Sequence, residues 1–195
     1  MYEKHIKRWL DIFFAIIITV IMSPFLALIV ILIWFFNGSP VIFKQNRPGY
    51  KNKVFEIYKF RTMIDKFDNN GDEIDDSDRI TKIGKFLRAT SLDELPQLFN
   101  VVKGDMSFIG PRPLLPMYIE DKNKLNISRH DVRPGVTGLA QINGRNMISY
   151  EKRFEYDVEY IKKMSFWFDC EILIKTVFKL VVRHESIIND DAFNK

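Results

Sequence analysis

The sequence predicts an α+β protein that is mainly helical, with a membrane-associated helical segment followed by a small cytoplasmic domain. Three patterns predict this class: an apolar run without a charged residue at residues 12–36, two short strand-like segments after it, and apolar residues at helical spacing in the remainder. We expect residues 1–36 to form the membrane segment and residues 37–195 to form the cytoplasmic domain.

The composition limits the possible partners. The chain has 195 residues, enough for one domain, and a formal net charge of +4 with a pI of about 9.0. That mild excess suits an anionic membrane surface or phosphorylated ligands and is too small to predict nucleic-acid binding. The one cysteine, Cys170, excludes an intrachain disulfide and fits a reducing compartment.

The apolar run contains a helix-breaking signal at its middle. Pro24 lacks an N–H and its ring clashes with the carbonyl of Val20, while Ser23 can donate a hydrogen bond about one turn back, to the carbonyl of Thr19. Each arm has about a dozen residues, or roughly 18 Å of helix, against a hydrocarbon core of ~30 Å. We therefore expect a re-entrant helix-break-helix hairpin that is broken at Ser23 and Pro24 and stays in one leaflet.

The flanks of the apolar run agree with this topology. Basic residues both precede and follow it: Lys4, Lys7, Arg8, Lys44, Arg47, Lys51, Lys53, Lys59 and Arg61. Because positive flanks stay in the cytoplasm, the protein is predicted to be monotopic with both termini cytoplasmic. The alternative is an ordinary membrane-crossing anchor with a tolerated proline.

A β-hairpin is predicted directly after the membrane segment. Residues 41–46 and 54–63 have strand patterns, and the loop between them contains Pro48 and Gly49. Lys59 and Arg61 lie two residues apart, so both project from one face of the second strand. They either bind an anion there or form a charged edge that discourages further strand pairing.

The carboxyl-terminal part predicts an amphipathic helix. Residues 171–183 combine a wide apolar face with charged residues that recur every four positions. Such a helix either packs on the domain core or lies in the membrane interface. The preceding aromatic residues, Phe166, Trp167 and Phe168, suit an interfacial depth.

The stretch that carries chemistry is RATSLDELPQLFNVVKGDMSFIGPRP at residues 88–113, which places Asp93 and Glu94 between its first and its last arginine. Carboxylates beside fixed cations suit chemistry on a phosphate. The cations neutralise the substrate oxygens, and the carboxylates attack, move protons or hold a metal. Ser91 and Glu94 also match a helix capping box, which is the structural alternative for Glu94 and places the pair near a helix amino-terminus.

Two loops offer further groups for an anion. Arg112 lies between two prolines that stiffen its backbone, which suits a cation that must not reorganise. The turn-like sequence RPGVTG at residues 133–138 could form a glycine-lined anion pocket. Gln141 and Arg145 follow within reach of the same loop.

Four ordered motifs resemble those of the small monotopic phosphoglycosyl transferases, in the bacterial sugar transferase family. They are KFRTM (59–63), RATSLDELPQLFN (88–100), KGDMSFIGPRP (103–113) and RPGVTG (133–138). The resemblance implies a ping-pong enzyme of the cytoplasmic membrane face that moves a phospho-sugar from a UDP-sugar to polyprenyl (undecaprenyl) phosphate, releases UMP and uses Mg²⁺. The short length resembles enzymes that start N-linked protein glycosylation in epsilon-type bacteria, which implies UDP-di-N-acetylbacillosamine as donor, and membrane lipids and downstream glycosyltransferases as partners.

The resemblance also assigns roles to individual residues. Asp93 matches the nucleophile that carries the covalent phospho-sugar, and Glu94 matches its partner, which handles the acceptor's proton or helps with the metal; both are the implied Mg²⁺ ligands. Ser23 and Pro24 match the membrane bend. The positions implied to bind the diphosphate, the lipid phosphate or the nucleotide are Lys59, Arg61, Arg88, Arg112, Arg133, Gln141, Arg145 and Asp157.

Two other functions stay open from the sequence. Residues 65–78 are acidic and predict a solvated loop, but Asp76 and Asp78 in it have the spacing with which many nucleotide-sugar glycosyltransferases hold a metal. In a direct glycosyltransferase of that kind, replacing both would abolish activity. In a membrane-docked scaffold without catalysis, Asp93→Asn would leave the phenotype intact.

Overall fold

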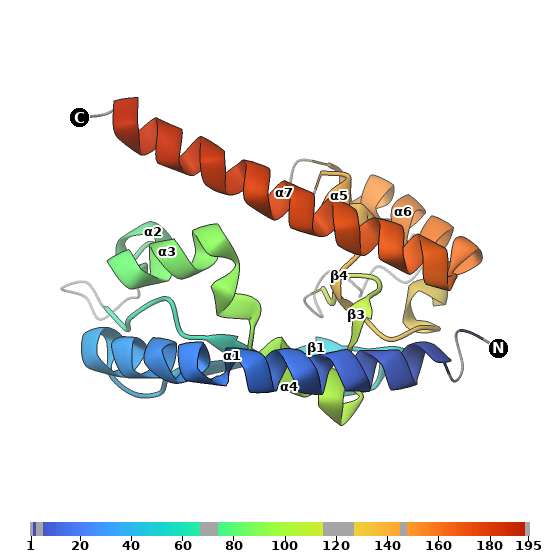
Figure 1. Ribbon diagram of the computed structural model, residues 1–195, viewed down its shortest axis with the longest axis horizontal. Helices are drawn as coiled ribbons and strands as arrows, with labels where there is room; N and C mark the ends of the chain where they lie inside the picture. The colour runs from blue at the N-terminus through green and yellow to red at the C-terminus, as the bar shows by residue number, and fades with distance from the viewer. Residues whose placement is uncertain (1, 3–5, 67–73, 115–126, 145–147, 194–195) are drawn as a thin grey trace.

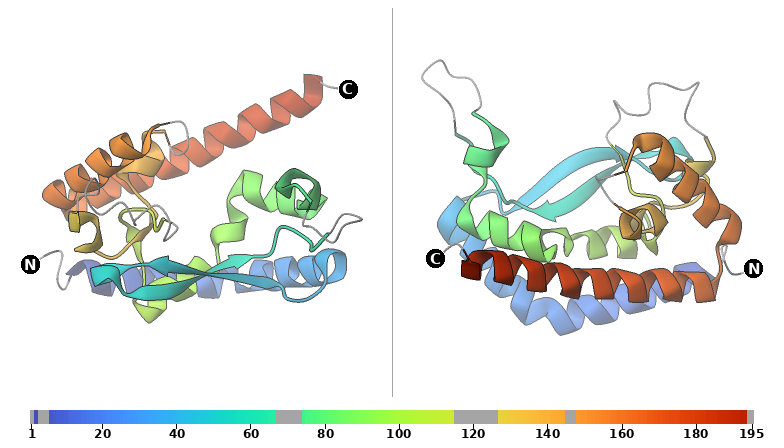
Figure 2. Two further views of the ribbon diagram at one scale, coloured as in Figure 1. Left: turned by 180° about the vertical axis from the view of Figure 1, so that it is seen from behind. Right: turned by 90° about the horizontal axis from the view of Figure 1, so that it is seen from above.

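The computed structural model describes residues 2, 6–66, 74–114, 127–144 and 148–193 (Figure 1). These residues are mainly helical, as predicted, with one β-hairpin and one small parallel sheet. In Figure 1 helix α1 lies along the bottom of the view and helix α7 along the top, and the view from above shows both long helices along one edge of the molecule (Figure 2, right). The elements are α1 (Lys7–Asn37), β1 (Ile42–Pro48), η2 (Tyr50–Asn52), β2 (Val54–Phe60), α2 (Asp76–Arg79), α3 (Lys82–Thr90), η3 (Leu92–Glu94), α4 (Gln97–Lys103), β3 (Ser107–Ile109), η5 (Ile127–His130), β4 (Gly135–Thr137), α5 (Leu139–Ile142), α6 (Tyr150–Lys163) and α7 (Phe166–Phe193).

Helix α1 runs through the predicted break without interruption. Pro24 lies inside the helix and cannot donate to the carbonyl of Val20, but Ser23 Oγ donates a 2.8 Å hydrogen bond to that carbonyl instead. The prediction of two separate helices is therefore wrong, and so is the expected bond from Ser23 to Thr19. Viewed from above, α1 is bowed rather than straight (Figure 2), as a proline inside a helix favours.

Both ends of α1 are bonded to the same domain. At its start, Lys7 Nζ lies 2.5 Å from Asp169 of α7, and Arg8 donates to two carbonyls at the end of α4. At its end, Asn37 Nδ2 donates to the carbonyl of Arg61, 3.1 Å away. Within the described ranges α1 is the one helix long and apolar enough to cross a membrane, and most of it is exposed. The domain thus holds this apolar helix at both ends and leaves its surface uncovered.

The predicted β-hairpin is confirmed, and one buried side chain fixes its position. Strands β1 and β2 pair antiparallel along their full length. Asn100 of α4 is fully buried; its Nδ2 donates to the carbonyl of Glu56 at 2.7 Å, and its Oδ1 accepts from the amide of Tyr58 at 3.0 Å. Because unpaired buried backbone groups are costly, this bidentate contact ties β2, and with it Lys59, to α4.

Helix α3 packs directly on the segment after the hairpin. Thr81 caps the helix by accepting a 3.0 Å hydrogen bond from the amide of Gly84. A Cβ at Gly84 would stand 2.0 Å from the carbonyl oxygen of Thr62, so only glycine permits this contact. The close packing brings Arg88 to Thr62, where its Nε donates a 2.8 Å hydrogen bond to the hydroxyl.

Helix α7 has one face in the core and one face exposed. Ile172 is fully buried, in a cluster with Tyr160 of α6. The apolar residues on the exposed face are Phe166, Trp167, Leu173, Ile174, Val177 and Phe178. The helix therefore packs on the domain and also presents the apolar surface that the sequence predicted for an interfacial helix.

Candidate active site

The acid pair lies in η3, the short turn between α3 and α4. Ser91 before it has a left-handed backbone (φ 59°, ψ 17°), and its side chain makes no capping hydrogen bond. The capping-box alternative for Glu94 is therefore wrong. Instead, the left-handed residue ends α3 and redirects the chain, so that Asp93 is buried at the turn and α4 begins shortly after Glu94.

Glu94 is held by two of the predicted cations. Lys59 Nζ, from β2, lies 2.6 Å from its Oε1, and Arg112 Nη2, from the loop after β3, lies 3.1 Å from the same oxygen. Burial acts to raise the pKa of Glu94, but Arg112 and Lys59 outweigh it and hold the pKa at about 2. Glu94 is therefore ionised at neutral pH and is a weak base in this arrangement.

Asp93 has the opposite environment. Burial raises its pKa above the ordinary value, and the charge of Glu94 adds to the rise, whereas Lys59 and Arg88 oppose it. No ion pair within 4.0 Å joins Asp93 to another described residue, in contrast to Glu94. The two carboxylates are thus distinguished: Glu94 is ion-paired with two cations, whereas Asp93 has the raised pKa and is the more basic of the two.

Several predicted site residues lie elsewhere. Strand β2 ends at Phe60, so Arg61 does not share a strand face with Lys59; it donates instead to the carbonyl of Ser39 and pairs with Asp65. The remaining residues of this group are Gln141, which is buried and donates to the carbonyl of Val136, and Asp157, which is buried against Arg129. Arg145 lies outside the described residues.

The glycines of the predicted anion pocket lie where two segments of backbone cross closely. The amide of Gly110 donates to the carbonyl of Thr137, and the amide of Gly135 donates to the carbonyl of Pro111, so these donors are used within the protein. A Cβ at Gly135 would stand 2.1 Å from the amide nitrogen of Gly110. These glycines allow two backbones to cross closely and do not bind a ligand through those two amides.

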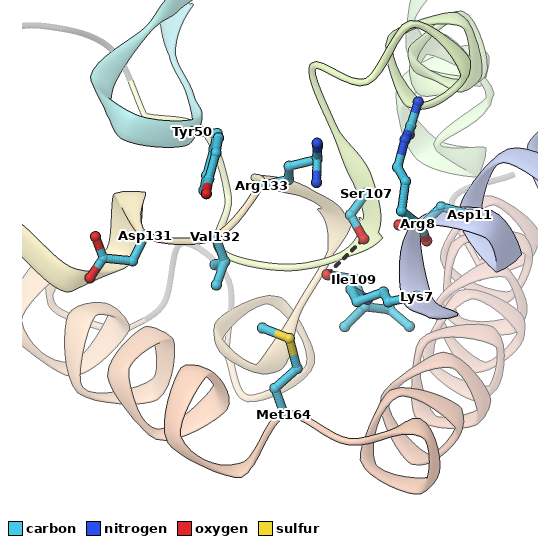
Figure 3. Close-up of a pocket in the computed structure, with 10 residues that line it drawn as sticks. All are labelled: Lys7, Arg8, Asp11, Tyr50, Ser107, Ile109, Asp131, Val132, Arg133 and Met164. Atoms are coloured by element: carbon cyan, nitrogen blue, oxygen red, sulfur yellow. Dashed lines mark hydrogen bonds between the residues drawn. The ribbon is translucent and has the colours of Figure 1, made fainter. Parts of the chain in front are cut away.

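Arg133 lies in a separate cavity of about 270 Å³, whose lining residues Figure 3 shows. Its Nε donates to the carbonyl of Gly104 at 2.9 Å, and its guanidinium lies over the ring of Tyr50. Arg8 lines the same cavity and donates to Val101 and Val102, the neighbouring carbonyls of α4. Arg133 thus satisfies the end of α4 and does not join the cations around Glu94.

Sequence reasoning missed three residues that build the site. Thr62 orients Arg88, Asn100 places β2, and Arg129 donates to the carbonyl of Arg112. Thr62 and Asn100 lie inside two of the motifs that carry the family resemblance. The sequence therefore points to these two residues but does not reveal which groups they bond. No local pattern distinguishes Arg129, because its partners are distant in sequence.

The carboxylates suit a magnesium ion that is held mainly by substrate. No group of three or more His, Cys, Asp or Glu side chains with metal-binding geometry occurs in the part of the chain that the structure describes. Mg²⁺ is commonly bound by one or two carboxylates together with substrate phosphates and water. Asp93, assisted by Glu94, fits that donor set once a diphosphate is present.

A carboxylate pair ordered by cations lies on a domain that is bonded to both ends of a long exposed apolar helix, an arrangement that suits chemistry on phosphate at a membrane surface. The chain belongs to the bacterial sugar transferase family, whose sequence profile matches residues 2–183.

Several curated relatives are similar over most of this chain. The uncharacterized sugar transferase EpsL of Bacillus subtilis (strain 168) is 48% identical over 177 residues, which cover 91% of this chain and 88% of that protein. The UDP-glucose:undecaprenyl-phosphate glucose-1-phosphate transferase of Escherichia coli (strain K12) is 43% identical, over 91% of this chain and 40% of that protein. The undecaprenyl-phosphate galactose phosphotransferase of Salmonella typhimurium (strain LT2) is 38% identical, over 94% of this chain and 42% of that protein.

Proposed function

We propose that the protein transfers a phospho-sugar from a UDP-sugar to polyprenyl phosphate and releases UMP. The observation that carries the proposal is the division of the acid pair: Glu94 is bound by Lys59 and Arg112, and Asp93 beside it is buried with a raised pKa. The names of the E. coli and Salmonella relatives, which act on undecaprenyl phosphate, support this choice of acceptor.

In the first step a carboxylate oxygen of Asp93 attacks the β-phosphorus of the donor. The bond from that phosphorus to the bridging oxygen breaks, UMP leaves with the oxygen, and an aspartyl phospho-sugar remains. The attack brings two anions together. Lys59, Arg88 and Arg112 offset the repulsion, at about 1.5–3 kcal/mol for each charged hydrogen bond to the phosphate.

In the second step a phosphate oxygen of the polyprenyl phosphate attacks the same phosphorus. The bond to Asp93 breaks, the free carboxylate returns, and a polyprenyl diphosphate sugar forms. A phosphate monoester has a second pKa of about 6, so the acceptor is largely deprotonated at neutral pH and needs no strong base. This agrees with the pKa of about 2 at Glu94, which favours the ordering of cations over proton transfer.

Magnesium completes the proposed site. Asp93 and Glu94 would hold the ion together with the donor diphosphate, and the ion would supply charge neutralisation at the phosphate oxygens. The covalent relay separates the two substrates in time, so the aqueous donor and the membrane-bound acceptor need not be bound together.

The membrane arrangement that we propose is monotopic, with both termini on the cytoplasmic face. It is supported by the bonds that join Lys7 to Asp169 and Asn37 to Arg61, since both ends of the apolar helix contact one domain. The positively charged flanks support the cytoplasmic side. The exposed apolar face of α7 would lie in the interface beside α1.

Cysteine labelling in sealed inverted vesicles and in intact cells tests this topology. The variants Lys4→Cys and Lys44→Cys, in a Cys170→Ser background, are both expected to react with a membrane-impermeant maleimide in inverted vesicles and to be protected in intact cells. Labelling of the two positions from opposite sides of the membrane would show that α1 crosses it.

The reaction is tested by product analysis in detergent micelles with polyprenyl phosphate and Mg²⁺. The donors are UDP-di-N-acetylbacillosamine, which we propose on the motif resemblance, and UDP-glucose, UDP-galactose and UDP-N-acetylgalactosamine. We expect UMP and a polyprenyl diphosphate sugar, greatest yield with the first donor, and loss of both products on chelation of Mg²⁺. A direct glycosyltransferase would instead release UDP, and it would be inactivated by replacing both Asp76 and Asp78, which the proposal does not require.

A further inference from the structure

Arg129 and Asp157 form a buried ion pair beside the Arg112 turn. Arg129 Nη2 lies 3.1 Å from Oδ2 of Asp157, and both side chains are 5% exposed. The same nitrogen donates a 2.7 Å hydrogen bond to the carbonyl oxygen of Arg112. The guanidinium also lies over the ring of Phe154, 5.0 Å from its centroid. One side chain therefore joins helix α6 to the turn that carries a site cation.

Stability alone does not explain this pair. Burying two charges is costly, and such pairs are often no more stabilising than apolar residues of similar volume. Nε and Nη1 of Arg129 are also buried without a hydrogen-bond partner among the residues that the structure describes, which adds to the cost. A costly polar pair next to a site is better explained by what it holds in place.

The Arg112 side chain needs such support. It is 46% exposed, so packing does little to fix it, yet its Nη2 reaches Glu94 at 3.1 Å. The prolines on both sides restrict its backbone, and Arg47 Nη1 donates to the carbonyl of Pro113 at 3.4 Å. Arg129 bonds the carbonyl of Arg112 and Arg47 bonds that of Pro113, so two successive peptide groups are fixed. This fixes the direction in which the Arg112 side chain leaves the backbone.

We propose that Arg129 and Asp157 are positioning residues for the transfer reaction: they hold the peptide of Arg112 so that its guanidinium meets Glu94 and the substrate phosphate. This inference rests on the proposed function. Asp157, which the sequence resemblance assigned to the substrate, then acts through Arg129 and does not touch the donor.

A double-mutant cycle of Asp157→Asn and Arg112→Ala tests the proposal, with steady-state UMP release as the readout. Asp157→Asn alone is expected to lower kcat by about 10- to 100-fold and to change KM for the UDP-sugar by less than ~3-fold, because a misplaced charge acts mainly in the transition state. In the Arg112→Ala background it is expected to lower kcat by less than ~2-fold, since the positioned group is gone. Glu159→Gln, which removes an exposed pair with Lys163 on the same helix, is the matched control and should keep kcat.

A second variant separates positioning from folding. Arg129→Met combined with Asp157→Leu replaces the pair by apolar residues of similar volume and is expected to keep the melting temperature while kcat falls as in Asp157→Asn. Wild-type kcat in this folded variant, or equal losses in the two backgrounds of the cycle, would overturn the positioning role. Unfolding of both variants would assign the pair to folding and count equally against it. Failure of the proposed function looks different, because the wild-type protein would then release no UMP.

Discussion

Replacing Asp93 by asparagine is expected to lower transfer by at least about 10⁴-fold, the scale seen when a covalent nucleophile is removed. Asparagine keeps the size of the side chain and removes the charged oxygen that would attack the β-phosphorus. The direct measurement is intact-protein mass spectrometry after incubation with a UDP-sugar and Mg²⁺, without lipid acceptor. The wild-type protein should gain the mass of one phospho-sugar as UMP appears, and Asp93→Asn should gain none.

The control for this result is Asp65→Asn, which makes the same chemical change at an exposed carboxylate paired with Arg61. It should form the adduct at the wild-type rate, because Arg61 does not join the cations around Glu94. An adduct that persists in Asp93→Asn would assign the nucleophile to another residue. UMP release that requires the lipid acceptor, with no adduct in the wild-type protein, would instead indicate a single displacement.

The sequence predicted the parts of the fold that depend on local pattern. The hairpin follows from two strand-like segments around Pro48 and Gly49, and the helical structure of residues 12–36, although not its continuity, follows from an uncharged apolar run. The predicted break at Pro24 does not occur. The free-energy cost of a proline inside a helix depends on whether the carbonyl that loses its amide donor, here that of Val20, finds another donor. Ser23 supplies that donor, and a rule based on proline alone does not include it.

For the candidate site, residue type was easier to predict than location. Lys59 and Arg112 bind Glu94 as expected, whereas Arg61 and Arg133 bond backbone carbonyls elsewhere. An arginine near a glycine-rich turn can bind a phosphate or satisfy the end of a helix equally well, because both offer oxygen acceptors. Only the position of α4 decides between these roles, and that position depends on contacts far apart in sequence.

The second large effect is expected at Asp169, where the first turn of α1 joins α7. Its carboxylate is 6% exposed and accepts hydrogen bonds from Lys7 Nζ at 2.5 Å, Tyr2 Oη at 2.6 Å and Tyr160 Oη at 2.8 Å. Asp169→Ala would leave the Lys7 ammonium buried without its counter-ion and two hydroxyls without their acceptor. Removing one partner of a buried ion pair costs about 3–5 kcal/mol, which for a chain of this size lowers the melting temperature by roughly 6–20 °C.

The melting temperature in detergent micelles measures this effect, and Glu171→Ala is its matched control on the same helix. Glu171 pairs with Lys175 at the surface, where such pairs contribute about 0–1 kcal/mol, so that variant should melt close to the wild-type protein. Equal melting temperatures for Asp169→Ala and the wild-type protein would mean that the buried cluster does not hold α1. A fall in melting temperature of the expected size would show that the polar cluster at Asp169 holds the amino-terminal end of the apolar helix on the domain. Asn37 bonds the other end to the carbonyl of Arg61, so both ends would then stay on one domain, as the proposed monotopic arrangement requires.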